Sequence, residues 1–206
     1  MNNFVITIAR GYGSGGRTIG KMLAKELNIG YYDRELLRLA SDDSGINEEL
    51  FGKADEKIKN SILFKAARKV YKGELIPPDS DDFVSNRNLF NYQAKVMKEL
   101  AETETCVIVG RCADFVLKDN KNVLKIFVHA PLESCIEKVM ELNSLSRKDA
   151  EKLILTTDKN RAEYYKHYTG REWDNAMNYD LCLNSSELGF DKCVQLVKAY
   201  IDIRMK

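Results

Sequence analysis

A glycine-rich segment, GYGSGGRT, spans Gly11 to Thr18. Its spacing fits a phosphate-binding loop, in which a glycine, four residues and a second glycine precede Lys and then Ser or Thr, except that Arg17 replaces the Lys. Such loops need glycines because backbone N–H groups curl around phosphate oxygens, and the following helix adds its positive end. The residues expected to hold the phosphates of ATP are Gly11, Gly13, Ser14, Gly15, Gly16, Arg17 and Thr18. The Thr18 hydroxyl would also be a ligand of Mg²⁺.

The same glycines also fit the fingerprint of dinucleotide-binding folds. Gly11, Gly13 and Gly16 have the G-x-G-x-x-G spacing, and Asp33 follows at about the distance of the acid that binds the ribose. The basic residue and threonine directly after the last glycine favour the phosphate-binding loop. A long helical stretch after Asp33 does so too, because a dinucleotide-binding fold normally continues with another strand. A plain tight turn is the third interpretation, and four glycines within six positions argue against it.

Strands and helices alternate around this segment. Phe4 to Ala9 form a nearly continuous apolar run, typical of a parallel strand buried on both faces, and helical spacing follows from Thr18 to Leu27. Further apolar runs are Cys106 to Val109, Leu124 to Val128 and, more weakly, Tyr179 to Leu183. This alternation predicts an α/β fold with a parallel sheet flanked by helices, whose ligands bind beyond the carboxyl ends of the strands.

The segment between Asp33 and Glu104 has no convincing strand pattern. Helical spacing occurs twice, at Ile58, Ile62, Leu63, Ala66 and Val70 and at Leu89, Tyr92, Val96 and Leu100. A loop that holds two of the three prolines, ELIPPDSDD, separates the two helices. We therefore expect a single domain over residues 1–206, with a helical insertion over about 41–104.

Composition limits the partners of this chain. Its 206 residues are 44% hydrophobic and 31% charged, with 32 Lys and Arg against 31 Asp and Glu. This balance provides no net field for nucleic acid or an anionic membrane, so neither is an expected partner. Five scattered cysteines and no signal-peptide pattern favour a reduced, cytoplasmic protein. Two histidines are too few for a histidine-rich metal centre.

From Phe4 to the last strand, the order of segments resembles the cytidylate kinase-like family of P-loop nucleoside monophosphate kinases. GYGSGGRT has the layout of the family's loop, YYDRELL looks like its second-strand segment, and CVIVGR resembles its strand ending in Gly-Arg. LKIFVHAPLE resembles the next strand, and DKNR at 158–161 resembles the arginine-rich lid. The resemblance implies a P-loop NTPase fold, ATP and Mg²⁺ as cofactors, and a lid over about 156–175.

The resemblance also assigns residues to the acceptor. Asp33 would lie in the monophosphate site, and Arg111 would contact the acceptor nucleotide. Arg38 would meet the acceptor phosphate, although its register is one residue away from that of the family's arginine. Gln93 looks like the family's glutamine in the helix before the Gly-Arg strand.

Phosphoryl transfer mainly requires positive charge around the moving group. The resemblance implies that Arg17, Lys159 and Arg161 supply this charge as catalytic residues. The chain departs from the family at Arg17, at Arg34-Glu35, where the family has Ser-Gly, and at Cys112, where it has Asp. These departures affect recognition of the base more than transfer of the phosphate.

Two of the acids also have structural interpretations. Asp33 would be the N-cap of a helix that starts near Arg34, and Asp114 would cap a helix after Gly110. The aromatic cluster between Tyr164 and Trp173 is expected to pack the lid on the body rather than to stack on nucleic-acid bases.

These features together predict ATP-dependent transfer of a phosphoryl group to a small nucleotide, a nucleoside monophosphate with CMP as the first candidate. One alternative is a nucleotide-binding regulatory protein without turnover, which the departures at Arg17 and Cys112 suggest. The other is a P-loop kinase of a different small acceptor.

Overall fold

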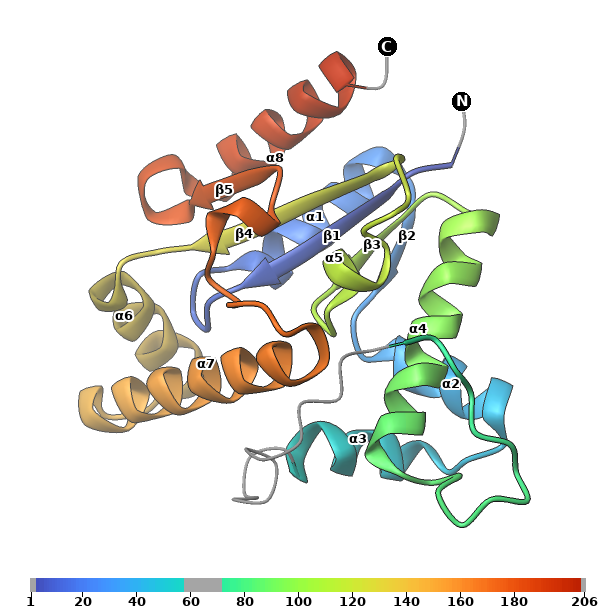
Figure 1. The fold of residues 1–206 in the computed structure, drawn as a ribbon. Coiled ribbons are helices and arrows are strands. Elements are labelled where there is room, and N and C mark those ends of the chain that lie inside the picture. The colour runs from blue at the N-terminus through green and yellow to red at the C-terminus, as the bar shows by residue number, and fades with distance from the viewer. Residues whose placement is uncertain (1–2, 58–71, 205–206) are drawn as a thin grey trace.

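The computed structural model describes residues 3–57 and 72–204. In these ranges one sheet of five parallel strands is present (Figure 1), formed by β1 (Val5–Arg10), β2 (Gly30–Tyr32), β3 (Cys106–Val109), β4 (Val123–His129) and β5 (Leu181–Asn184). The predicted α/β fold with a parallel sheet is therefore confirmed. Each predicted apolar run lies on a strand, with ends that differ by two residues or fewer.

Helices connect the strands. They are α1 (Gly16–Leu27), α2 (Glu35–Ser44), α3 (Glu48–Lys57), α4 (Asn86–Thr103), α5 (Ala113–Val116), α6 (Leu132–Asn143), α7 (Arg147–Thr169) and α8 (Ser185–Arg204), with a 3₁₀ turn at Ala176–Asn178. The hydroxyls of Ser85 and Ser146 accept backbone N–H groups and cap α4 and α7, and α7 ends at Gly170 in the left-handed conformation. Within the described ranges, none of these helices is long and apolar enough to cross a membrane.

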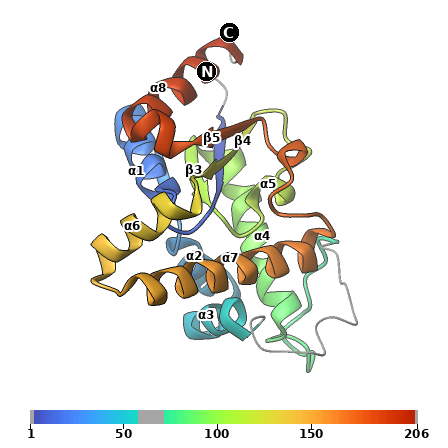
Figure 2. The same cartoon turned by 90° about the vertical axis from the view of Figure 1, so that its left-hand side faces the viewer.

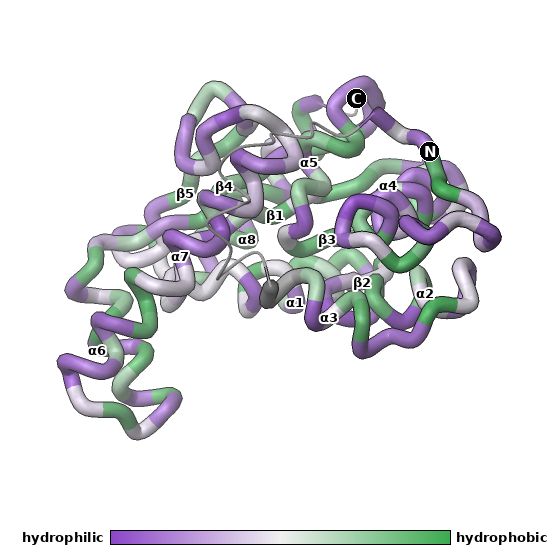
Figure 3. Tube along the Cα trace, turned by 60° about the horizontal axis from the view of Figure 1, so that its bottom comes forward, coloured by the Kyte–Doolittle hydropathy of each residue, from purple (hydrophilic) through white to green (hydrophobic). Residues whose placement is uncertain are grey.

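Both faces of the sheet are covered. Val107 and Val109 pack with residues of α1 and α8, whereas Cys106 and Ile108 belong to the core cluster that includes residues of α4 and α5. Figure 2 shows α1 and α8 on one side of the sheet and α4 and α5 on the other. Side chains of a strand alternate between its faces, so a strand covered on both faces must be apolar throughout. Figure 3 shows that the central strands are mostly hydrophobic, with polar residues such as Lys125 among them, while the helices mix both characters.

The strand order β2-β3-β1-β4-β5 decides between the two interpretations of the glycine loop. Val5 of β1 pairs with Cys106 of β3 on one side and Val123 of β4 on the other, which leaves β2 at the edge of the sheet. In dinucleotide-binding sheets the second strand lies directly beside the first. The insertion of β3 between β1 and β2 therefore contradicts the dinucleotide-binding interpretation.

The described residues between β2 and β3 form helices and loops and contain no strand. α2, α3 and α4 pack together around Leu36, Phe51 and Phe90. The helical spacing predicted at 58–70 lies outside the described residues. The limits of the proposed helical insertion, about 41–104, stay a prediction, since α2 already begins at Glu35.

α7 carries most of the predicted lid and crosses the molecule at the carboxyl ends of the strands (Figures 1 and 2). Tyr168 stacks on Phe90 of α4 with ring centroids 3.9 Å apart, and Tyr165 and Tyr168 are both buried. The predicted packing of this aromatic cluster on the body is confirmed. Because α7 begins at Arg147 and is continuous, the region 156–175 starts inside a helix.

Candidate active site

The glycine loop turns directly from β1 into α1. Gly13 and Gly15 have φ values of +83° and +78°, and Gly15 is the N-cap of α1. A Cβ at Gly13 would lie 2.9 Å from the carbonyl oxygen of Cys135, and one at Gly15 would lie 2.3 Å from the Phe190 ring. Both the backbone conformation and the available space therefore require glycine. No side chain caps α1, so its first N–H groups suit an anion.

The Ser14 side chain holds this loop against the end of β4 through hydrogen bonds. Its hydroxyl is buried and donates to the carbonyl oxygens of Gly11 at 2.9 Å and Val128 at 3.0 Å. The Ser185 hydroxyl in turn donates to the Ser14 carbonyl at 2.7 Å. The side chain of Ser14 is thus used inside the fold and is not available to hold a phosphate.

The predicted lid motif contacts the loop directly. The backbone N–H of Tyr12 donates to the Asp158 carboxylate at 2.9 Å. Arg161 donates to the same carboxylate at 2.9 Å and to the Arg10 carbonyl at 3.1 Å. Burial raises the pKa of Asp158 and lowers that of Arg161. α7 is therefore docked on the first residues of the loop.

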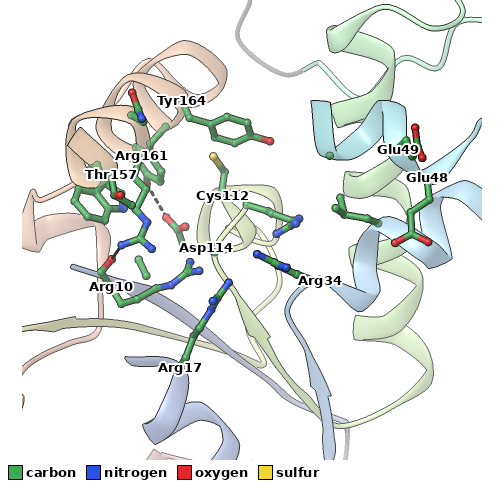
Figure 4. A pocket seen from close by; sticks show the side chains of 18 residues that line it. Arg10, Arg17, Arg34, Glu48, Glu49, Cys112, Asp114, Thr157, Arg161 and Tyr164 are labelled. Carbon is green, nitrogen blue, oxygen red and sulfur yellow. Dashed lines mark hydrogen bonds between the residues drawn. The ribbon is translucent and has the colours of Figure 1, made fainter. Parts of the chain in front are cut away.

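A cavity of about 610 Å³ opens beside the loop (Figure 4). Its lining includes arginines from five segments of the described chain, namely Arg10 of β1, Arg17 of α1, Arg34 before α2, Arg111 after β3 and Arg161 of α7. The carboxyl ends of parallel strands meet at one edge, which explains how residues so far apart in sequence gather here. Such a concentration of positive charge favours a polyanionic ligand.

Asp33 at the end of β2 pairs with two of these arginines. Its Oδ2 lies 2.7 Å from Arg17 Nε, and its Oδ1 lies 3.8 Å from Arg10 Nη2. The Asp33 side chain is only 11% exposed. The N-cap position of α2 belongs to Arg34 and has no side-chain hydrogen bond, so the N-cap interpretation of Asp33 is wrong. The carboxylate is instead used to hold the arginines.

The Gly-Arg turn after β3 has an unusual backbone. Gly110, Arg111 and Cys112 are consecutive residues with φ values of +80°, +54° and +57°. The left-handed region costs a residue with a side chain on the order of 1 kcal/mol or more. The turn places both Arg111 and Cys112 on the wall of the cavity.

The structure brings only part of the predicted site together. Arg17, Arg111 and Arg161 line the cavity, whereas Arg38 and Lys159 are exposed and are not among its described lining residues. Two lining arginines were not predicted as ligands, Arg10 and Arg34. Arg10 had one signal in the sequence, since it is a charged residue that ends an apolar strand directly before the glycine loop.

Asp114 does not cap α5, because the N-cap position is that of Cys112. Asp114 is buried within the first turn of α5, and its Oδ2 accepts the hydroxyl of Tyr165 at 2.6 Å. Burial raises the pKa of this carboxyl group, and the Tyr165 hydrogen bond partly offsets that rise. The pair therefore joins α5 to α7 on the wall of the cavity, since both residues line it.

Replacing Tyr165 by Phe will lower the free energy of unfolding at neutral pH by about 1–3 kcal/mol, because the buried carboxylate loses a donor. The pKa of Asp114 will rise further above its unfolded value, so the native state will bind more protons and regain stability as the pH falls. Urea unfolding near neutral and at mildly acidic pH should therefore show a smaller difference from the wild type in acid. Tyr200→Phe on α8 is the control, and a pH-independent loss in Tyr165→Phe would contradict this account.

Comparisons with known proteins identify the family of this chain. Residues 5–187 match the model of the cytidylate kinase-like family. The cytidylate kinase of Methanopyrus kandleri is 26% identical over 96% of this chain and 93% of its own length. The cytidylate kinase of Pyrococcus horikoshii is 25% identical over 98% of this chain and 90% of its own length.

Solved structures with a similar fold are also known. An uncharacterized protein from Eubacterium ventriosum has a TM-score of 0.71 and 26% identity, over 97% of this chain and 99% of its own. A shikimate kinase from Bacteroides thetaiotaomicron has a TM-score of 0.55 and 15% identity, over 97% and 98% of the two chains, and so supports the P-loop NTPase fold alone. With its glycine loop, its strand order and a family match that covers most of its length, this chain belongs to the cytidylate kinase-like family.

Proposed function

We propose that this protein transfers a phosphoryl group from ATP to a nucleoside monophosphate, with CMP as the first candidate acceptor. The family supports a nucleotide-binding phosphotransferase. The observation that carries the proposal is the gathering of five arginines from separate segments beside a glycine loop with the backbone of a phosphate site. A donor and an acceptor that both carry phosphate need this much positive charge in one cavity.

The donor and the acceptor would bind on different sides of the cavity. The glycine loop and the start of α1 would hold the ATP phosphates, and Arg111 and Arg34 would hold the acceptor phosphate. One acceptor phosphate oxygen would bond to the γ-phosphorus, while the bond from that phosphorus to the leaving oxygen of ADP breaks and its electron pair stays on ADP. Arg17 and Arg161 would stabilise the charge on the moving group, and Lys159 would have to approach from the exposed face of α7.

The residues present fit magnesium bound through the substrate. Thr18 is exposed in the first turn of α1 and would supply a hydroxyl oxygen. Among the described residues no three His, Cys, Asp or Glu side chains form a metal-binding group. This donor set suits Mg²⁺, which is commonly held by few protein ligands together with phosphate oxygens and water. When bound, the ion would neutralise charge on the ATP phosphates.

The far side of the cavity supports an acceptor whose base carries an amino group. Glu48 and Glu49 of α3 line the cavity across from Arg10, Arg17 and Arg161 (Figure 4). Leu37 of α2 and, from the side of α7, Tyr164 and Trp173 add apolar and aromatic walls suited to a planar base. Carboxylates accept hydrogen bonds, so an exocyclic amino group such as that of cytosine is a better match than a carbonyl.

A coupled assay of ADP release with ATP, Mg²⁺ and a panel of nucleoside monophosphates will test the proposal. We expect CMP to give the highest kcat/KM and UMP, which lacks the amino group, to be at least tenfold poorer, equal to about 1.4 kcal/mol. ADP release with none of the panel, in a protein that still binds ATP, would favour the regulatory alternative. Faster release with a phosphate-free acceptor would favour a P-loop kinase of another acceptor.

A further inference from the structure

Arg10 bridges the donor and acceptor sides of the cavity. It is the last residue of β1 and directly precedes Gly11 of the phosphate-binding loop. The other end of its side chain lies over the Gly-Arg turn, where a Cβ added to Gly110 would be 2.2 Å from Arg10 Nη1. A single guanidinium group therefore lies between the loop that would hold the donor and the turn that would hold the acceptor.

The charge of Arg10 is incompletely neutralised inside the protein. Its side chain is only 13% exposed, and its nearest carboxylate oxygen, that of Asp33, is 3.8 Å from Nη2. In the described part of the chain, its buried Nε has no hydrogen-bond partner. Burial, and next the charge of Arg161, lower the pKa of Arg10 to about 9. A buried cation without close partners is costly, so this position suits an incoming anion.

Arg10 and Arg17 differ in exposure and in how their side chains are held. The Arg17 side chain is 50% exposed and is held by Asp33 at 2.7 Å through Nε. Arg10 is fixed on a central strand between β3 and β4, with its Cβ only 2.5 Å from the position that a Cβ on Gly16 would take. A buried cation that extends from a central strand is already in place when charge develops during the reaction, and such preorganised charge lowers the barrier.

We propose that Arg10 is a catalytic residue that contacts the phosphoryl group while it passes from donor to acceptor. This inference rests on the proposed function. The phosphorus gains a bond to the acceptor oxygen and loses its bond to ADP, whose oxygen keeps the electron pair. Arg10 donates hydrogen bonds to the oxygens of the moving group and transfers no proton.

Kinetics of Arg10→Ala test the assignment. We expect kcat to fall by about tenfold to a hundredfold, while the KM values for ATP and acceptor stay within about threefold. Arg204→Ala is the matched control. Arg204 is the last residue of α8 and pairs with Asp180, and neither residue is among the described residues that line the cavity. Added guanidinium ion at non-denaturing concentration should restore activity to Arg10→Ala, whereas urea, which is neutral and of similar shape, should not.

A binding measurement separates catalysis from a structural role. ADP with aluminium fluoride and CMP imitates the planar phosphoryl group, and it should raise the Tm of the wild type more than ADP and CMP do. Arg10→Ala and Arg10→Gln should lose this additional rise and keep the stabilisation by ADP alone; Arg10→Gln serves if the alanine variant does not fold. Equal loss of both stabilisations would make Arg10 a positioning residue and overturn the proposal.

The two hypotheses fail in different ways. Wild-type protein that phosphorylates a nucleotide while Arg10→Ala keeps its kcat would overturn the assignment of Arg10 and leave the proposed function intact. Wild-type protein that releases no ADP with any nucleotide acceptor would overturn the proposed function itself.

Discussion

Replacing Gly16 by Val will abolish the stabilisation of the protein by ATP and Mg²⁺. A Cβ at this position would lie 2.5 Å from the Cβ of Arg10 and 3.4 Å from that of Val128. Neither atom is the end of a flexible side chain, so the start of α1 must shift and the loop N–H groups will no longer converge on one anion. At ATP concentrations near 100 times Kd, about 2.7 kcal/mol of ligand stabilisation would be lost.

Gly52→Val provides the matched control for this experiment. It adds the same side chain to another helical glycine, in α3, which lines the acceptor side of the cavity rather than the glycine loop and where an added Cβ meets no atom within 4 Å. This variant should keep its thermal shift with ATP, while circular dichroism verifies that both variants are folded. A folded Gly16→Val protein with the wild-type shift would exclude the glycine loop from the ATP site.

Replacing Arg17 by Ala will lower kcat by about a hundredfold to a thousandfold, with a much smaller loss of ATP affinity. Asp33 binds Arg17 through Nε, which leaves the two terminal amino groups for phosphate oxygens. Removal of the guanidinium therefore takes charge from the transition state rather than from the bound ground state. Steady-state kinetics with saturating ATP and acceptor will measure this loss.

Arg17→Lys tests whether the active site has adapted to a guanidinium group in place of the usual lysine or has lost its catalytic function. A lysine has a single ammonium group and cannot bind Asp33 and bridge two phosphate oxygens as a guanidinium does, so we expect this variant to be slower than the wild type. Arg111→Ala provides the contrast, because it should raise the acceptor KM or lower kcat and leave ATP affinity nearly unchanged. An Arg17→Ala enzyme as fast as the wild type would remove Arg17 from the catalytic group.

The amino-acid sequence by itself determined the strands of the sheet, the helix after the glycine segment and the position of the phosphate-binding loop. These follow from local patterns: β1 and β3 are buried on both faces and so read as continuous apolar runs, and the loop needs glycines at Gly13 and Gly15 for backbone conformation and space. The matching order of these segments also indicated the family, which the comparison over residues 5–187 shows.

Only the tertiary structure decided which charged side chains meet. Arg34 lines the cavity and Arg38 does not, although residues four apart share a helix face, because Arg38 lies one turn further along α2, beyond the cavity. Lys159 and Arg161 differ for another reason: two residues apart on α7, they lie on different faces, and the bonds of Asp158 and Arg161 to the loop fix the rotation of that helix. Arg10 meets the Gly-Arg turn only because β3 pairs beside β1, and that pairing joins residues about a hundred positions apart in the chain, beyond the reach of any local pattern.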